Sequence, residues 1–70
     1  MDLAQFTSDY LATFENGISR DAVALAALAR EIAEAYCEMD PALETVDGPT
    51  WTAAVDRYAP QVAYYLPAPR

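Results

Sequence analysis

The chain of 70 residues has no histidine and no lysine, and it holds one cysteine and two glycines. Histidine is the usual general acid or base near neutral pH, and Ser–His and Cys–His nucleophile pairs require it. One cysteine without histidine cannot build a Cys/His zinc site. Gly17 and Gly48 stand in unrelated contexts, so a glycine-rich phosphate loop is absent. We therefore expect a protein that is not an enzyme and carries no cofactor.

Long apolar runs and a partner for Cys37 are missing as well. No stretch approaches the ~20 apolar residues that span a membrane, and we find no basic-then-apolar leader for secretion. A single cysteine forms no internal disulfide, so the fold needs no oxidising compartment. We expect a cytoplasmic protein without a membrane partner. With 54% hydrophobic residues the chain is too apolar for disorder, and its length allows one domain.

Hydrophobic spacing predicts an all-α fold, a small three- or four-helix bundle over residues 1–66 with a flexible tail at 67–70. The first helix is expected over residues 2–15, because apolar side chains recur there every three or four positions. Asn16 and Gly17 favour a stop, since both tolerate the left-handed conformation that closes a helix. The apolar positions are Leu3, Phe6, Tyr10, Leu11 and Phe14.

Ser19 is the expected N-cap of a second helix that runs to about Met39. Ile18 and Val23 stand where a hydrophobic staple would form around that cap. Many alanines favour the helix and allow a neighbouring helix to approach closely. The expected buried stripe consists of Leu25, Leu28, Ile32, Tyr36 and Met39.

Asp40 and Pro41 end the second helix, because the residue before a proline is pushed away from helical geometry. The same pair is able to cap and begin a brief helical turn over residues 41–45. Residues 47–49, Asp-Gly-Pro, predict a loop.

A third helix is expected to begin near Pro49 or Thr50. Pro60 either kinks this helix or makes it stop at Tyr58, because proline removes a backbone donor and clashes with the preceding turn. The apolar face of this helix consists of Trp51, Val55, Tyr58, Val62 and Tyr65. The aromatic side chains expected in the core are Phe6, Tyr10, Phe14, Tyr36, Trp51 and Tyr58.

The net charge of −7 belongs to the middle of the chain. Residues 31–56 hold seven acids and no base, whereas residues 1–30 hold four acids and two arginines. Residues 57–70 hold two arginines and no acid. The negative charge is therefore segregated, with no basic patch for direct nucleic-acid binding.

Glu31, Glu34 and Glu38 share one face of the second helix, because their spacing is i, i+3 and i+7. This face is expected to point to solvent, away from the apolar stripe. The last acids lie near the negative end of the helix dipole and repel one another, an arrangement that opposes local stability. Three further acids, Asp40, Glu44 and Asp47, extend the charge beyond the helix end.

This acidic region has three alternative interpretations. A solvated acidic surface keeps a small protein soluble, which is what charge runs usually mean. A rigid row of carboxylates also imitates the phosphate backbone and fits a basic groove. A divalent metal site is the third interpretation, although the patterned twelve-residue calcium loop with its central glycine is absent. We expect no metal.

Tyr64 and Tyr65 are adjacent, so both cannot face the same core, and one of them is expected at the surface. Tyrosine is enriched at protein interfaces, and Trp51 would add contact area nearby. Cys37 has acidic neighbours that raise the pKa of a thiol, so a reactive thiolate is not expected.

Short, strongly acidic, single-domain chains with carboxylates gathered in one region, here Glu31 to Asp56, resemble phage-encoded inhibitors of the anti-CRISPR and anti-restriction type. The resemblance lies in size and charge layout. It implies a DNA mimic that blocks the basic nucleic-acid-binding groove of a bacterial nuclease or surveillance complex. The partner-binding residues would be Glu31, Glu34, Glu38, Asp40, Glu44, Asp47, Trp51, Tyr64 and Tyr65.

The competing hypothesis is a helical interaction module, such as an antitoxin, an adaptor or a small regulatory subunit, that docks through an apolar helix face. A bundle this short has a limited core, so pairing with a partner or as a homodimer would stabilise it. Mimicry predicts salt-sensitive binding centred on the acids. Helix docking predicts salt-insensitive binding centred on Trp51, Tyr64 or Leu66.

Overall fold

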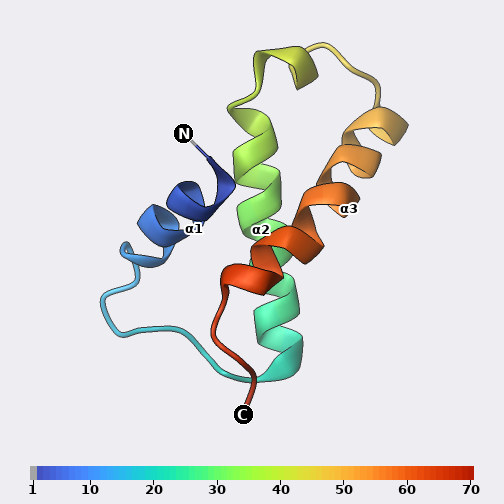
Figure 1. Cartoon of the computed structure of the whole chain (residues 1–70). Coiled ribbons are helices and arrows are strands. Elements are labelled where there is room, and N and C mark those ends of the chain that lie inside the picture. Colours follow the sequence, from blue (N-terminus) through green and yellow to red (C-terminus); the bar gives the residue numbers. More distant parts are fainter. Residues whose placement is uncertain (1) are drawn as a thin grey trace.

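The computed structural model describes residues 2–70 as three α-helices and one short 3-10 helix, with no strand among them (Figure 1). The helices are α1 (Leu3–Leu11), α2 (Ala22–Glu38) and α3 (Gly48–Tyr65), and η1 (Pro41–Leu43) joins α2 to α3. α2 is the central element, with contacts to α1, η1 and α3. The predicted small all-α bundle is confirmed.

Every helix that begins within residues 2–70 follows an aspartate. The aspartate side chain accepts a hydrogen bond from a backbone N–H of the first turn, which would otherwise lack a partner. The caps with their N–H donors are Asp2 with Gln5 at 2.8 Å, Asp21 with Ala24 at 3.1 Å, Asp40 with Ala42 at 3.0 Å and Asp47 with Thr50 at 2.9 Å. Four of the eleven acids therefore have a structural role.

The predicted N-cap of the second helix is wrong, because Asp21 and not Ser19 caps α2. The Ser19 hydroxyl accepts a hydrogen bond from the Asp21 backbone N–H at 3.2 Å, in the turn before the helix. With the helix starting at Ala22, Val23 falls in the first turn instead of the position that a staple requires. Val23 is accordingly 77% exposed and makes no staple with Ile18.

α1 ends at Leu11, four residues before the predicted end. The Thr13 hydroxyl donates to the Tyr10 carbonyl at 2.7 Å, and this local bond competes with helix continuation. The backbone N–H groups of Thr13 and Phe14 donate to carbonyls three residues back, which tightens the chain into turns. Gly17 adopts a φ of +78° beyond these turns. Phe14 is 38% exposed, so its prediction as a core residue is wrong.

α3 begins at Gly48, inside the segment 47–49 that was expected to be a loop. The Asp47 side chain caps the first turn, and Pro49 fits there because a first-turn N–H needs no helical partner. The predicted brief turn after Asp40 is confirmed as η1.

α3 continues through Pro60 to Tyr65, so it does not stop at Tyr58. Proline deprives the carbonyl of the residue four positions earlier, Asp56, of its helical donor. Pro60 and Asp56 are both exposed, so water is able to hydrate the freed carbonyl.

The core is small and comes from all three α-helices. Close packing of α2 on α3 relies on the buried Ala29 and Ala33, as the alanine-rich sequence predicts. Met39 departs from the predicted stripe, because it follows the end of α2 and is 63% exposed. The buried cluster consists of Leu3, Ala29, Ile32, Ala33, Cys37, Val55 and Val62.

Partly buried aromatic rings surround this cluster. The Tyr36 ring of α2 packs edge-on against Phe6 of α1 and Tyr58 of α3, with centroid distances of 5.3 Å to each. Tyr10 and Trp51 also pack against the core. These five predicted core aromatics therefore form its outer layer, since none of them is fully buried.

The C-terminal residues 67–70 have no regular secondary structure and lie beside the start of α2 (Figure 1). The Arg70 backbone N–H donates to the Arg20 carbonyl at 2.9 Å. The Arg20 guanidinium donates to the Ala68 carbonyl at 3.3 Å.

Candidate functional site

The three glutamates predicted to share a face of α2 are all exposed to solvent. The opposite face of the helix carries the buried Ala29, Ile32 and Ala33, which fixes α2 against α1 and α3. Glu31, Glu34 and Glu38 therefore project from a helix that is held in place by its core contacts.

The surroundings of Glu31 and Glu34 differ. Burial raises the pKa of Tyr10 above its ordinary value, and the Glu31 carboxylate raises it further, which places Glu31 where α1 meets α2. Glu34 instead lies 3.5 Å from the Arg30 guanidinium, one turn back along α2. Arg30 also lies 2.7 Å from Asp56 of α3. The negative charge of the segment 31–56, which contains no base, is thus partly neutralised by Arg30 directly before it.

Asp40 and Asp47 cap η1 and α3. Hydrogen bonds from Thr50 hold the pKa of Asp47 below its usual range. Both carboxylates therefore give part of their hydrogen-bond acceptor capacity to the fold. Glu44 is exposed and has no such role among residues 2–70.

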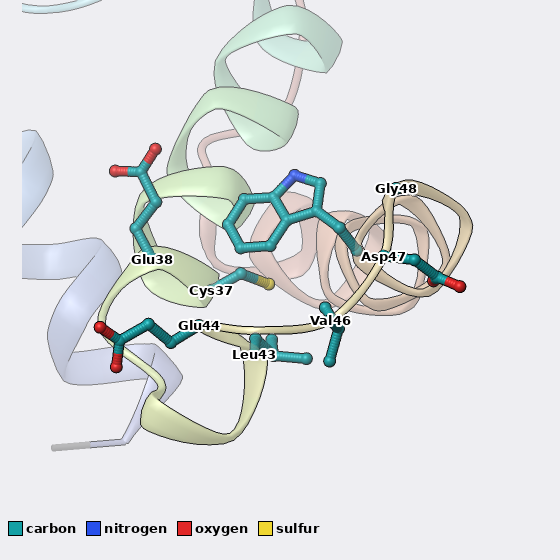
Figure 2. Close-up of a pocket in the computed structure, with 8 residues that line it drawn as sticks. Cys37, Glu38, Leu43, Glu44, Val46, Asp47 and Gly48 are labelled. Carbon is teal, nitrogen blue, oxygen red and sulfur yellow. The ribbon is translucent and has the colours of Figure 1, made fainter.

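One pocket brings together four of the predicted partner-binding residues where α2, η1 and α3 meet (Figure 2). It has a volume of about 470 Å³. Trp51 contributes an aromatic ring to the lining, and Figure 2 shows Glu38 and Glu44 on the same side of the pocket. The lining residues are Cys37, Glu38, Leu43, Glu44, Val46, Asp47, Gly48 and Trp51.

Sequence reasoning did not include Leu43, Val46 and Cys37 in this site. Leu43 and Val46 are the apolar residues between two helix caps, which is a weak signal in the sequence. Burial raises the pKa of the Cys37 thiol, and the charges of Asp40 and Glu34 raise it further. The thiol is therefore expected to stay protonated and unreactive near neutral pH.

Tyr64 and Tyr65 lie apart from this pocket, near the other end of α3. Tyr64 follows Trp51 by thirteen positions in α3, which is roughly 20 Å along the helix at ~1.5 Å per residue. Tyr64 is 84% exposed and Tyr65 47%, so both rings are at the surface. Their centroids are 5.6 Å apart in an edge-to-face arrangement. The nine predicted residues therefore do not form one continuous site.

Within residues 2–70, no three or more cysteine or acidic side chains gather as a metal site would require. None of the helices described for this part of the chain has the length and apolar character needed to cross a membrane. Comparisons of the chain with protein-family models, curated protein sequences and solved structures find no match. The candidate site is thus defined by the geometry of this chain alone.

Proposed function

We propose that this protein is a non-enzymatic inhibitor that occupies the basic nucleic-acid-binding groove of a bacterial defence complex, a CRISPR–Cas effector or a restriction nuclease, by imitating DNA. The observation that carries the proposal is the row of exposed glutamates on α2, continued by Glu44 after η1. A groove that binds DNA faces one phosphate charge per ~1.7 Å of duplex axis, and it offers cations to any rigid row of anions.

The spacing of the row supports this function. Glu31, Glu34 and Glu38 span roughly 10 Å along the helix axis at ~1.5 Å per residue. The core contacts of α2 hold the helix in place, so binding costs little additional backbone entropy. The net charge of −7 also accelerates the encounter with a basic partner.

A competition experiment tests the proposal. Purified restriction nucleases and CRISPR–Cas effectors are mixed with labelled target DNA, and the protein is expected to displace the DNA from at least one of them. Displacement should weaken steeply as salt is added, because both partners are charged. Binding of the labelled DNA by the protein itself should not be detected.

A charge-matched pair of variants sharpens the test. Glu31→Gln, Glu34→Gln and Glu38→Gln together should abolish displacement while circular dichroism shows an intact fold. Asp2→Asn, Asp9→Asn and Glu15→Gln remove the same charge elsewhere and should retain it, since asparagine also caps helices. Undiminished displacement by the first variant at low salt would contradict the proposal.

The exposed pair Tyr64 and Tyr65 favours a second candidate function, a helical interaction module that docks through an apolar surface. Exposed tyrosines with a large contact area are typical of interface centres. In that case binding to the partner resists salt, and Tyr64→Ala abolishes it. The glutamate variants would then bind like the unchanged protein.

A further inference from the structure

The pocket between α2, η1 and α3 has the chemistry of a cation site. Its volume of about 470 Å³ lies within the ~300–1,000 Å³ typical of ligand pockets. Its wall includes the half-buried indole of Trp51 and the apolar side chains of Leu43 and Val46. An aromatic face attracts cations through its quadrupole, so this wall is more than an apolar surface.

Two carboxylates at this pocket have no partner among residues 2–70. Glu38 and Glu44 make no ion pair and no side-chain hydrogen bond among residues 2–70. Figure 2 shows Glu38 and Glu44 on one side of the pocket and Asp47 on the other, and Trp51 also lines it. Asp47 differs from them because it accepts the Thr50 N–H.

None of the arginines in the described residues 2–70 lines the pocket. Arg30 is engaged with Glu34 and Asp56, and the residues that line the pocket are acidic, apolar or small. A cation that occupies the site therefore has to come from another molecule.

We propose that this pocket binds an arginine side chain of a protein partner, with the guanidinium against the Trp51 indole and paired with Glu38 and Glu44. A guanidinium is planar, stacks on aromatic faces and offers several N–H donors to carboxylates. The aliphatic part of the arginine side chain packs against Leu43 and Val46. A lysine ammonium matches only the charge, since it is compact and strongly hydrated.

This inference rests on the proposed function, because it names the group by which a basic partner is held. The specific contact with the partner then lies at one pocket at the end of α2 and not along the whole row of acids. The acids on the middle of α2 then contribute long-range attraction, and the pocket contributes the specific contact.

Trp51 is the only tryptophan of the chain, so its fluorescence reports on this pocket. An acetylated hexa-arginine amide is titrated into the protein at physiological ionic strength, with isothermal calorimetry as a second readout. We expect saturable binding that changes the Trp51 emission. The corresponding hexa-citrulline peptide, which is neutral and of similar shape, should not bind, and hexa-lysine should bind several-fold more weakly.

Two double variants with equal net charge distinguish binding in the pocket from long-range electrostatic attraction by the whole protein. Glu38→Gln with Glu44→Gln should weaken hexa-arginine binding about tenfold, equivalent to ~1.4 kcal/mol. Asp9→Asn with Glu15→Gln removes the same charge from α1 and the turns after it, and the affinity should change less than about twofold. All four side chains are exposed, so circular dichroism should show both variants folded.

The proposed arginine site is overturned if both double variants lose the same affinity for hexa-arginine. It is also overturned if neither the Trp51 fluorescence nor calorimetry shows binding. Equal affinity for hexa-lysine overturns the assignment to a guanidinium. If DNA is displaced from a target but Glu38→Gln with Glu44→Gln competes like its matched control, the pocket is wrong and the proposed function stands. If hexa-arginine binds as expected but no nuclease or effector loses its DNA, the proposed function is wrong and the pocket stands.

Discussion

The Arg30 guanidinium lies 2.7 Å from the Asp56 carboxylate and joins α2 to α3 along their exposed edges. The same guanidinium lies 3.5 Å from Glu34. Both acids belong to the segment 31–56, whose charge has no base to offset it in the sequence. The acids of this segment that have no ion pair among residues 2–70 are Glu31, Glu38, Asp40, Glu44 and Asp47.

Arg30→Gln tests the strength of this link. Both partners are about half-exposed, so solvent screens the pair and the free energy of unfolding should fall only slightly. Urea unfolding followed by circular dichroism measures the change. Arg57→Gln is the control, since Arg57 is exposed and has no salt bridge within the described part of the chain. A loss of several kcal/mol would show that the link is a main support of the fold.

The reassigned N-cap gives a second prediction. Asp21→Ala removes the acceptor for the Ala24 N–H and should lower the free energy of unfolding by about 1 kcal/mol. Ser19→Ala removes only a turn contact outside the helix and should cost clearly less. Thermal and urea unfolding of the two variants, compared in the same buffer, measure the difference. A larger loss of stability for Ser19→Ala than for Asp21→Ala would indicate that Ser19 is the N-cap of α2.

The Asp47 cap predicts a dependence of stability on pH. The pKa of Asp47 is lower in the folded protein because the carboxylate accepts hydrogen bonds from Thr50. Its contribution to stability is complete above the unfolded-state pKa of about 3.9 and is lost as the pH falls through the folded-state value. Asp47→Asn keeps a capping side chain that does not titrate in this range.

Urea midpoints of the unchanged protein and of Asp47→Asn, measured from neutral pH down to about pH 2.5, test this dependence. The advantage of the unchanged protein should shrink as the pH falls. A difference that stays constant over the whole range would show that Asp47 titrates alike in the folded and unfolded chains.

Thr7 gives a fourth prediction, because its buried hydroxyl has no hydrogen-bond partner among the described residues 2–70. Thr7→Val keeps the shape of the side chain and removes the polar group. The free energy of unfolding should rise by about 1 kcal/mol, since the desolvation cost of the hydroxyl disappears. Thr7→Ser keeps the hydroxyl, loses a buried methyl group and should destabilise the protein. Urea unfolding of both variants gives the comparison, and a less stable Thr7→Val would indicate an unseen partner for the hydroxyl.

The elements of the fold were predictable where the sequence pattern is strong and local. The spacing of apolar residues predicted α2 and α3, and Asp40 with Pro41 predicted η1. The boundaries were less predictable, because Ser19 and Asp21 are both good caps and only the packing of α2 selects between them. The early end of α1 depends on the bond from Thr13 to the Tyr10 carbonyl, which competes with a pattern that otherwise favours a longer helix.

The candidate site was likewise predictable only in part. Helical periodicity alone places Glu31, Glu34 and Glu38 on one face, and they are exposed as predicted. The grouping of Glu38 and Glu44 with Trp51 was not predictable, because it depends on how η1 turns the chain back.

The sequence by itself determined the helical class, the position of the acids along the chain and the absence of histidine chemistry. These properties follow from composition and from the 3.6-residue period, which act over one or two turns. The tertiary structure decided which charges remain available for a partner. Arg30 reaches an acid 26 positions away, and Trp51 and Glu38 line the same pocket from two helices. Such contacts arise because α3 packs back against α2, and local spacing in the sequence does not encode that arrangement.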